Sequence, residues 1–482
     1  MFAIPKLKVI PIFSVIFCAL ILITLCLQYP FSTTFPIGGD APYYIQRSQV
    51  ALTVINDPIA AIRAVRKSWY PLSLVIFSSS AVIPIDWPMR FTWYMTVSHI
   101  LTGVILSRLL YRISGWRAAA LVMVIWAITT TGITTHVEDG TLAQLISFIF
   151  LALFLERISA GASWGAAAAL VATTLAHPVT GLFLLSCMAI ATPILLSTWP
   201  RQSPSEKKQI AIVCSISLLV LVSVVFIGKS VFTAAVNING VMNNPFINIL
   251  VSRFAPFVAL SPLGLLILLK STKPTTLKFI IGTMFSLAAI MAGNDLLGIS
   301  VWLDRLAPLF IFIVAMLAAI GLSHIIKSVF LSTTSRATFL LVFIALVSVS
   351  AWRSNMNVFE FYENLDNNSR VHPEEIAAMY WIRDNISPDS FIITAINSRH
   401  AEWLPALTYK QWLPLSENDS FMSNPTGDNN ESPTYHKLKY VAFFKFHQNV
   451  PSVFTENPLD YPLIFSNDAL DIFNIPPQKD AI

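Results

Sequence analysis

The segment DRLAPLFIFIVAMLAAIGL, residues 304–322, places an aspartate and an arginine directly before a run of apolar residues. A helix crosses the hydrocarbon core of a bilayer with about 20 such residues, and the next basic residue here is Lys327. Similar segments recur along the chain of 482 residues, which is 55% hydrophobic and 12% charged, with a mean hydropathy of +0.66. These values lie outside the range of soluble globular proteins and predict a polytopic α-helical membrane protein.

Charge and cysteine content narrow the functional classes. The formal net charge is +5, and the basic residues are spread over short loops instead of forming a tail or a stripe. That pattern argues against nucleic acid as a partner. The cysteines all lie inside apolar segments without metal-ligand spacing, so we expect packing residues, neither metal ligands nor a disulfide framework. They are Cys18, Cys26, Cys187 and Cys214.

The N-terminal segment MFAIPKLKVIPIFSVIFCALILITLCLQYP, residues 1–30, has basic residues before an apolar run, as a signal peptide does. The run has the length of a transmembrane helix and lacks a small-residue cleavage site. We therefore expect a retained first helix that runs outward from the cytoplasmic side.

The apolar segments form a self-consistent path of about eleven transmembrane helices when lysine and arginine are kept on the cytoplasmic side. The clearest basic loops, which this path places inside, are 112–117, 201–209 and 270–278. The N-terminus is then inside and the C-terminus outside. We expect a multi-pass protein of the cell (inner) membrane.

One short apolar segment decides the orientation of every later helix. YPLSLVIFSSSAVIPID, residues 70–86, is shorter than a span, and we predict that it lies in or dips into the interface. If it crossed the membrane, all later helices would invert and the loops 201–209 and 270–278 would face outward against the charge rule.

The path divides the chain into two domains. Residues 1–353 form the transmembrane domain, whose first outer loop, 31–88, carries interfacial helices, and residues 354–482 form a small, more polar α/β domain outside the membrane. In the second domain we expect a helix with acidic residues in its first turn, two buried strands and a hairpin turning at Asn467–Asp468. These elements are 372–386, 389–395, 439–444 and 462–475, and the polar segment 416–437 is a loop.

Ionisable residues gather on the outer side of this path. At membrane depth such residues are costly to desolvate, which makes them candidates for function. The alternative is that they are ordinary charges at loop ends. They are Asp40, Glu138, Asp139, His177, Asp295, Asp304 and Arg305.

Asp40 lies in GGDAPYYIQR, residues 38–47. A helix that begins at Asp40 places Tyr44 and Arg47 on the same face, at spacings of four and seven. An aspartate followed by proline in the first turn is an ordinary N-cap. A carboxylate at the membrane face can also accept a proton from an acceptor hydroxyl. The two roles are compatible, and the spacing favours neither.

Four further candidate residues follow along the chain. Glu138 and Asp139, in HVEDG, either bind a divalent cation together with Asp40 or form a solvated turn. His177, which ends an apolar segment in AHPVTG, either packs in the interior or lines the site. Arg305 suits a phosphate or pyrophosphate, which a guanidinium binds through two hydrogen bonds; the alternatives are pairing with the neighbouring aspartate or reaching the headgroups.

These motifs resemble the C-type integral-membrane glycosyltransferases, the GT-C superfamily. DAPYYIQR, residues 40–47, is similar to the Asp-x-x-Tyr-Tyr-x-x-Arg opening of the oligosaccharyltransferase branch, and EDG at 138–140 occupies the position of the second acidic motif. The segments 304–322 and 374–395 look like the late span and the start of the soluble domain in prokaryotic members.

The resemblance implies a GT-C-like fold and a hexosyl- or pentosyltransferase. Such an enzyme moves a sugar from a polyprenyl-phosphate donor in the membrane to an extracytoplasmic lipid, glycan or protein acceptor, with inversion at the anomeric carbon. The tail lacks the Trp-Trp-Asp-Tyr-Gly signature, so the resemblance favours transfer of a single sugar over transfer of a glycan to asparagine.

The same resemblance implies roles for the candidate residues. Asp40 acts as the catalytic base, and Glu138 and Asp139 share its catalytic or metal-binding role, with Mg²⁺ or Mn²⁺ as the divalent cation. The residues expected to bind substrate are Tyr44, Arg47, His177 and Arg305.

Two other functional classes fit the composition. A transporter or lipid flippase places its ionisable residues near mid-span and shows paired, interrupted helices, whereas here the carboxylates lie at helix ends and no half-repeat is visible. A non-catalytic cell-envelope scaffold would use the C-terminal domain to bind a partner. The glycosyltransferase is the favoured prediction.

Overall fold

The computed structural model describes residues 6–32, 41–53, 57, 59, 70–129, 141–227, 246–271, 274–292, 303–329, 332–363, 371–387, 391–394, 403–408, 411–414, 438–445, 450, 452–456 and 458–475. The chain divides into two compact units. The helical unit comprises Met1–Gly38 and Val65–Glu360, and the C-terminal unit comprises Gly39–Ala64 and Phe361–Ile482. The segment after the first apolar helix therefore clusters with the distant C-terminal residues.

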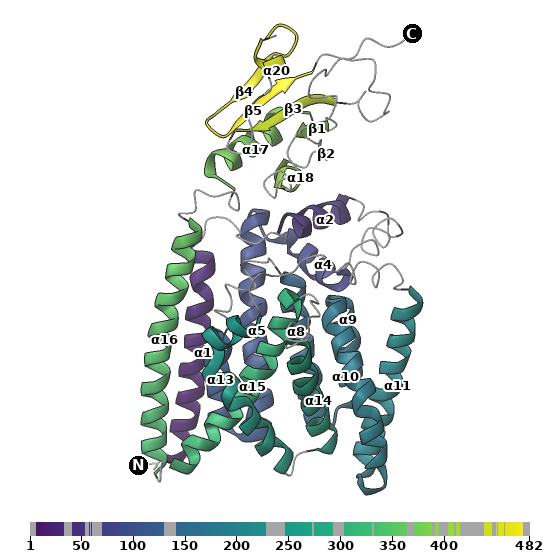
Figure 1. Cartoon of the computed structure of the whole chain (residues 1–482), viewed down its shortest axis with the longest axis vertical. Coiled ribbons are helices and arrows are strands. Elements are labelled where there is room, and N and C mark those ends of the chain that lie inside the picture. Colours follow the sequence, from purple (N-terminus) through teal and green to yellow (C-terminus); the bar gives the residue numbers. More distant parts are fainter. Residues whose placement is uncertain are drawn as a thin grey trace. The chain divides into compact units, whose positions relative to one another are not determined.

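The helical unit places a helix at each apolar segment predicted to span the membrane (Figure 1). Two short elements, α4 and the 3₁₀-helix η1, cover part of the segment predicted to be interfacial, and a second 3₁₀-helix, η2, lies in the basic loop after α10. The elements are α1 (Lys6–Ser32), α4 (Pro71–Ser78), η1 (Ser79–Val82), α5 (Trp87–Ser114), α6 (Trp116–Thr129), α8 (Leu142–Ser159), α9 (Ser163–Ala176), α10 (Pro178–Ser197), η2 (Trp199–Arg201), α11 (Pro204–Ile227), α13 (Phe246–Lys270), α14 (Thr275–Ala292), α15 (Leu303–Val329) and α16 (Thr333–Glu363).

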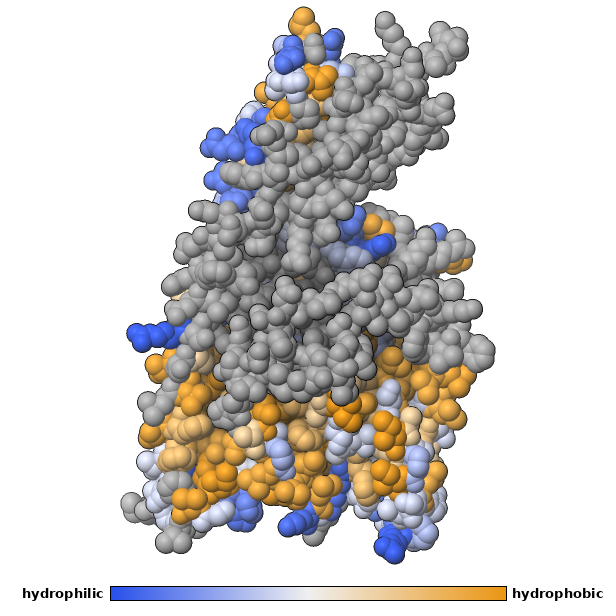
Figure 2. Space-filling model, viewed as in Figure 1, coloured by the Kyte–Doolittle hydropathy of each residue, from blue (hydrophilic) through white to orange (hydrophobic). Residues whose placement is uncertain are grey.

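Several of these helices are long and apolar enough to cross a bilayer. Among the described residues, length and composition select five: Pro11–Ser32, Leu142–Ser159, Pro178–Ser197, Pro308–Val329 and Thr334–Arg353. Figure 2 shows hydrophobic side chains over much of the visible helix surface, with hydrophilic ones at the lower ends. The integral-membrane prediction is confirmed, while the count of about eleven spans and the orientation stay predictions.

The helix α15 forms the centre of the helical unit. Of the apolar stretch of α15, 83% is buried inside the protein, against 25% for the apolar stretch of α16. Phe312 of α15 lies 5.9 Å from Trp126 of α6 and 5.2 Å from Phe148 of α8, measured between ring centroids. The Trp126 indole donates to the carbonyl of His99 in α5 at 3.0 Å, which satisfies its N–H in the interior.

Glycine allows α13 and α15 to pack with their backbones in contact. A Cβ on Gly264 of α13 would overlap the carbonyl oxygen of Leu317, and a Cβ on Gly321 of α15 would lie 2.7 Å from that of Leu260. Small residues serve this purpose in membrane helices, because lipid provides no hydrophobic drive to associate and close packing must replace it.

The segment predicted to lie at the interface is a short helix followed by a 3₁₀ turn. The helix α4 ends at Ser78 and η1 ends at Val82, so together they are shorter than the roughly 20 residues of a span. The Ser73 hydroxyl donates to the carbonyl of Ala176 at 2.9 Å, which ties α4 to the end of α9.

The C-terminal unit contains a mixed five-stranded sheet in the order β2-β1-β3-β5-β4. The strand β1 is parallel to both β2 and β3, and β5 is antiparallel to both β3 and β4. Four residues of β3, 441–444, are fully buried. The elements are α2 (Ala41–Thr53), α17 (Pro373–Asn385), β1 (Phe391–Thr394), α18 (Trp403–Thr408), β2 (Gln411–Pro414), β3 (Leu438–Phe444), α20 (Ser452–Glu456), β4 (Leu463–Ser466) and β5 (Leu470–Asn474).

The sequence predicted α17, β1, β3 and the β4–β5 hairpin, and the structure confirms each. The sequence did not predict α18, β2 or α20. The expected loop 416–437 lies outside the described residues. The helix α17 begins after His372, whose backbone N–H donates to the Glu375 carboxylate at 2.8 Å.

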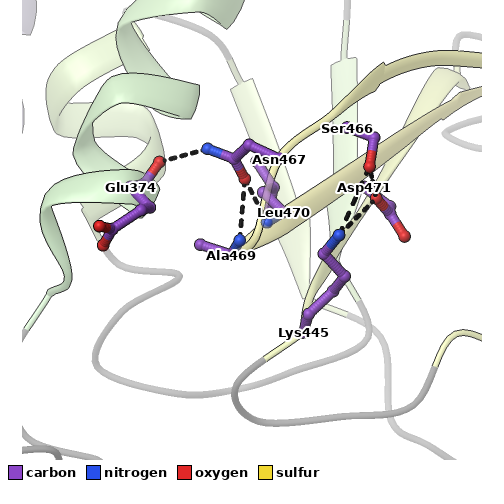
Figure 3. A network of polar contacts seen from close by, with 7 residues as sticks. All are labelled: Glu374, Lys445, Ser466, Asn467, Ala469, Leu470 and Asp471. Carbon is purple, nitrogen blue, oxygen red and sulfur yellow. Dashed lines mark hydrogen bonds and ion pairs between the residues drawn. The ribbon is translucent and has the colours of Figure 1, made fainter.

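Asn467 fixes the hairpin at the predicted turn (Figure 3). Its side-chain oxygen accepts from the backbone N–H groups of Ala469 and Leu470, at 2.9 and 2.7 Å, and its amide donates to the carbonyl of Glu374 in α17 at 2.8 Å. Nearby, Lys445, which directly follows β3, pairs with Asp471 of β5 at 3.1 Å. One side chain therefore joins the turn to the helix that packs beside it.

Gly264→Ala should destabilise the helical unit, because the new methyl group would push α13 away from α15. Overpacking of this kind costs on the order of 1–3 kcal/mol. The measurement is the thermal unfolding temperature of the purified chain in detergent. Gly282→Ala in α14 is the matched control, since its Cβ would meet nothing closer than Leu265 at 3.9 Å; equal unfolding temperatures for the two variants would contradict the packing.

Asn467→Ala should loosen the hairpin, since it removes three hydrogen bonds at the turn. We expect faster hydrogen–deuterium exchange over residues 463–474, corresponding to a local loss of about 1–3 kcal/mol. Asp468→Ala, at the exposed neighbouring position, should leave the exchange unchanged. Identical exchange in the two variants would show that Asn467 does not fix the turn.

Candidate active site

The acidic residues predicted to be catalytic lie beside described helices but outside the described residues. Asp40 directly precedes α2, which begins at Ala41. Glu138 and Asp139 lie between α6, which ends at Thr129, and α8, which begins at Leu142. Their catalytic and metal-binding roles therefore stay predictions. Elsewhere, the described residues hold no group of three His, Cys, Asp or Glu side chains that could hold a metal ion.

The helix α2, which follows Asp40, is amphipathic. Ala41, Tyr44, Ile45 and Ser48 are buried, whereas Val50 is exposed. This pattern follows the three-and-four spacing of a helix with one face against protein.

A hydrogen bond anchors α2 within the C-terminal unit. The Gln49 amide donates to the carbonyl of Ala406 in α18 at 2.7 Å, in a buried position. The bond joins residues 357 positions apart in the sequence. The helix α2 is thus held by the same unit that forms the C-terminal sheet.

Arg47 contacts Tyr43, a residue that the sequence analysis did not single out. The Arg47 guanidinium carbon lies 5.5 Å from the centre of the Tyr43 ring, one helical turn earlier, in a cation–π arrangement. Tyr44, which was predicted to bind substrate, is 1% exposed and meets Tyr43 edge-on at 5.8 Å. The spacing of four residues between Tyr43 and Arg47 is the feature of the sequence from which this contact could have been predicted.

The Tyr43 hydroxyl is buried and has no hydrogen-bond partner among the residues that the structure describes. A buried polar group without a partner costs about 1–3 kcal/mol. Since the Arg47 cation lies over the Tyr43 ring, the pair can offer one hydrogen bond and one positive charge to an oxyanion or a sugar hydroxyl.

His177 caps a helix at a junction within the helical unit. It is 1% exposed, and its Nδ1 accepts from the backbone N–H of Thr180 at 3.2 Å and lies 2.8 Å from the Thr180 hydroxyl. Its ring stacks on that of Tyr70, the residue before α4, at 5.3 Å. This geometry supports the packing role that the sequence left open, and the substrate-binding role stays a prediction.

Arg305 lies in the first turn of α15, which begins at Leu303. Backbone N–H groups in the first turn of a helix have no acceptor within the helix, and the helix dipole is positive there. The first turn of a helix is therefore a place where an anion is favoured, and phosphate binding by Arg305 stays a prediction. Tyr44 and Arg47 belong to the C-terminal unit, and His177 and Arg305 to the helical unit.

Comparisons by sequence identify no relative. No protein-family model matches the chain, and no curated protein matches it in sequence.

Comparisons by structure identify membrane glycosyltransferases. ArnT from Cupriavidus metallidurans, bound to undecaprenyl phosphate, aligns with a TM-score of 0.58 and 11% identity over 96% of this chain and 97% of its own. The oligosaccharyltransferase of Archaeoglobus fulgidus in its apo form gives a TM-score of 0.57 and 11% identity over 91% of this chain and 70% of its own. The mycobacterial arabinofuranosyltransferase AftD gives 0.52 and 12% identity over 95% of this chain and 41% of its own.

All three of these proteins are GT-C glycosyltransferases. The predicted resemblance is therefore confirmed at the level of the fold: the chain has the GT-C membrane fold with a small C-terminal sheet. The identities of 11–12% carry the fold alone.

His177→Ala should lower the thermal unfolding temperature, because it removes the cap of α10 and the stack on Tyr70. Loss of a cap costs typically about 1 kcal/mol. His177→Asn should recover part of this loss, since asparagine accepts the same backbone hydrogen bond but cannot stack. Wild-type stability in both variants would contradict the capping role.

Proposed function

We propose that this protein is a membrane glycosyltransferase that moves a sugar from a polyprenyl-phosphate donor to an acceptor outside the cytoplasm, with inversion at the anomeric carbon. One observation carries the proposal: nearly the whole chain shares its fold with ArnT, over 96% of this chain and 97% of that enzyme. A match of this extent covers the C-terminal unit as well as the helices. It supports an enzyme of this class more strongly than a match to the helices alone would.

The ligands of the structural neighbours support the class of donor. The ArnT structure holds undecaprenyl phosphate, and the Archaeoglobus oligosaccharyltransferase has been solved with dolichol-phosphate and an inhibitory peptide. Both lipids are polyprenyl phosphates, whose chains dissolve in the bilayer while the phosphate stays near the headgroups. For this chain we propose the same class of donor, with a hexose or a pentose as the sugar.

The proposed reaction is a single displacement. An acceptor oxygen attacks the anomeric carbon, the bond from that carbon to the phosphate oxygen breaks, and polyprenyl phosphate leaves with the bonding electrons. Asp40 takes the proton of the acceptor hydroxyl. Attack from the side opposite the leaving group inverts the anomeric configuration.

The charged and polar residues have complementary roles in this reaction. Arg305, in the first turn of α15, binds the phosphate of the donor, which gains negative charge as the bond breaks. Arg47 and the buried Tyr43 hydroxyl lie on α2 directly after Asp40 and orient the sugar or the acceptor. Tyr44 supports them by packing, and His177 holds the junction of α9 and α10.

A divalent cation is compatible with the predicted acidic residues. Asp40, Glu138 and Asp139 offer only carboxylate oxygens, the donors that Mg²⁺ and Mn²⁺ prefer. The Archaeoglobus enzyme has been solved in complex with zinc and sulfate. A bound cation would supply positive charge for the phosphate.

Asp40→Asn should abolish sugar transfer, because asparagine cannot accept the acceptor proton. With purified protein and a radiolabelled polyprenyl-phosphate sugar, we expect transfer to fall by about 10²-fold or more, the usual contribution of a general base. The readout is radiolabel in the acceptor fraction.

Asp86→Asn is the matched control for this experiment. Asp86 lies in the same predicted outer loop, is exposed, and precedes α5 without a side-chain capping bond. The Asp86→Asn variant should transfer sugar at the wild-type rate. Full transfer by the Asp40→Asn variant would refute the catalytic assignment. No transfer by the wild type with any polyprenyl-phosphate sugar would favour the transporter or scaffold classes.

A further inference from the structure

A buried carboxylate in the helical unit holds a group of arginines that the proposed reaction does not use. Glu156, in the last turn of α8, is 1% exposed. Its carboxylate pairs with Arg108 and Arg112 of α5, at 3.1 and 3.2 Å, and with the neighbouring Arg157 at 3.4 Å. We refer to these four residues as the arginine cluster.

The arginine cluster carries more positive than negative charge. Three guanidinium groups meet one carboxylate, so these four residues carry a formal charge of +2. Arg108 and Arg112 are one helical turn apart, a spacing at which like charges repel. Glu156 is therefore sufficient to hold the three cations together but not to neutralise them.

The arginines also reach solvent or lipid. Their side chains are 60%, 39% and 43% exposed for Arg108, Arg112 and Arg157 in turn. The contacts to Glu156 are close, but neither carboxylate oxygen has a contact with hydrogen-bond geometry among the described residues. The carboxylate thus attracts the guanidinium groups at 3.1–3.4 Å without aligned hydrogen bonds.

Two exposed aromatic residues flank the arginine cluster. Tyr111, beside Arg112 in α5, is 62% exposed, and Trp164, at the start of α9, is 67% exposed. The stem of Arg157 lies against α9 next to Trp164, since a Cβ on Gly165 would be 3.2 Å from its Cδ. Tyrosine and tryptophan are enriched at the depth of the lipid headgroups.

We propose that the arginine cluster binds the phosphate of an anionic phospholipid in the leaflet at this end of the helices. The excess charge supplies attraction, the buried carboxylate holds the guanidinium groups in place, and the aromatic residues fix the depth. Basic pockets between transmembrane helices bind the headgroups of such lipids. On the predicted orientation this is the cytoplasmic leaflet, opposite the outer loops that carry Asp40.

The experiment compares lipid binding to the purified full-length chain by native mass spectrometry. The probes are dioleoyl phosphatidylglycerol and dioleoyl phosphatidylcholine, which differ in headgroup charge alone. We expect the wild type to bind phosphatidylglycerol more tightly. Arg108→Gln/Arg157→Gln leaves Glu156 paired with Arg112, and should weaken binding roughly fivefold for each arginine removed, about 25-fold in total.

The control variant removes two positive charges elsewhere on the same predicted side. Arg201→Gln/Lys208→Gln alters exposed residues of η2 and α11 and should retain the preference for phosphatidylglycerol. If the double arginine variant does not fold, Arg108→Gln alone tests the most exposed member, with an expected fivefold loss.

Two results would overturn the proposal. The first is an unchanged preference for phosphatidylglycerol in the folded arginine variants. The second is displacement of the lipid by inorganic phosphate at equal concentration, which would make the cluster a site for free phosphate. Loss of the preference in the arginine variants alone, without displacement by phosphate, would support a lipid site.

Discussion

The structure depends on one constraint: in hydrocarbon, each backbone N–H and C=O must find its hydrogen bond within the chain. Continuous helices satisfy this requirement, so the long apolar segments are helical, and basic residues such as Arg112, Arg157 and Lys327 lie in their last turns. Buried polar side chains of the helical unit also find partners within it: the Trp126 indole, for example, donates to the carbonyl of His99. Where a charge is buried, as at Glu156, it is accompanied by three arginines. The chemistry is therefore expected in the loops and at the helix ends, which is where Asp40 and Arg305 lie in the sequence.

The apolar helices could be predicted from the sequence because length and composition determine them locally. The same holds for α17, with its acidic first turn, and for the hairpin at Asn467, whose side chain makes the bonds that an asparagine turn requires. The short elements α18 and β2 were missed because they are brief and stabilised mainly by neighbours from other parts of the chain. The clustering of α2 with the C-terminal unit rests on long-range contacts such as that from Gln49 to Ala406, which no local pattern records.

The helix after Asp40 could be predicted from the sequence, and Arg47 lies on it as expected. The cation–π contact between Arg47 and Tyr43 was not predicted. Helical spacing alone places both tyrosines near Asp40. Only the packed structure shows that Tyr43 contacts Arg47, while the Tyr44 ring is buried. His177 shows the reverse case: its sequence context allowed a ligand, while its contacts with Thr180 and Tyr70 are those of a cap. The sequence identity to enzymes of the same fold is low. Such low identity is expected where packing throughout the chain determines the fold and a few side chains determine the reaction.

The central claim is that the protein breaks the bond between a sugar and a polyprenyl phosphate. The most direct measurement uses proteoliposomes with a donor that carries one radiolabel in the sugar and another in the lipid. A glycosyltransferase must separate the two labels, leaving polyprenyl phosphate in the membrane and the sugar in the acceptor. Labels that stay together, whether the donor crosses the bilayer or remains in place, would contradict the account.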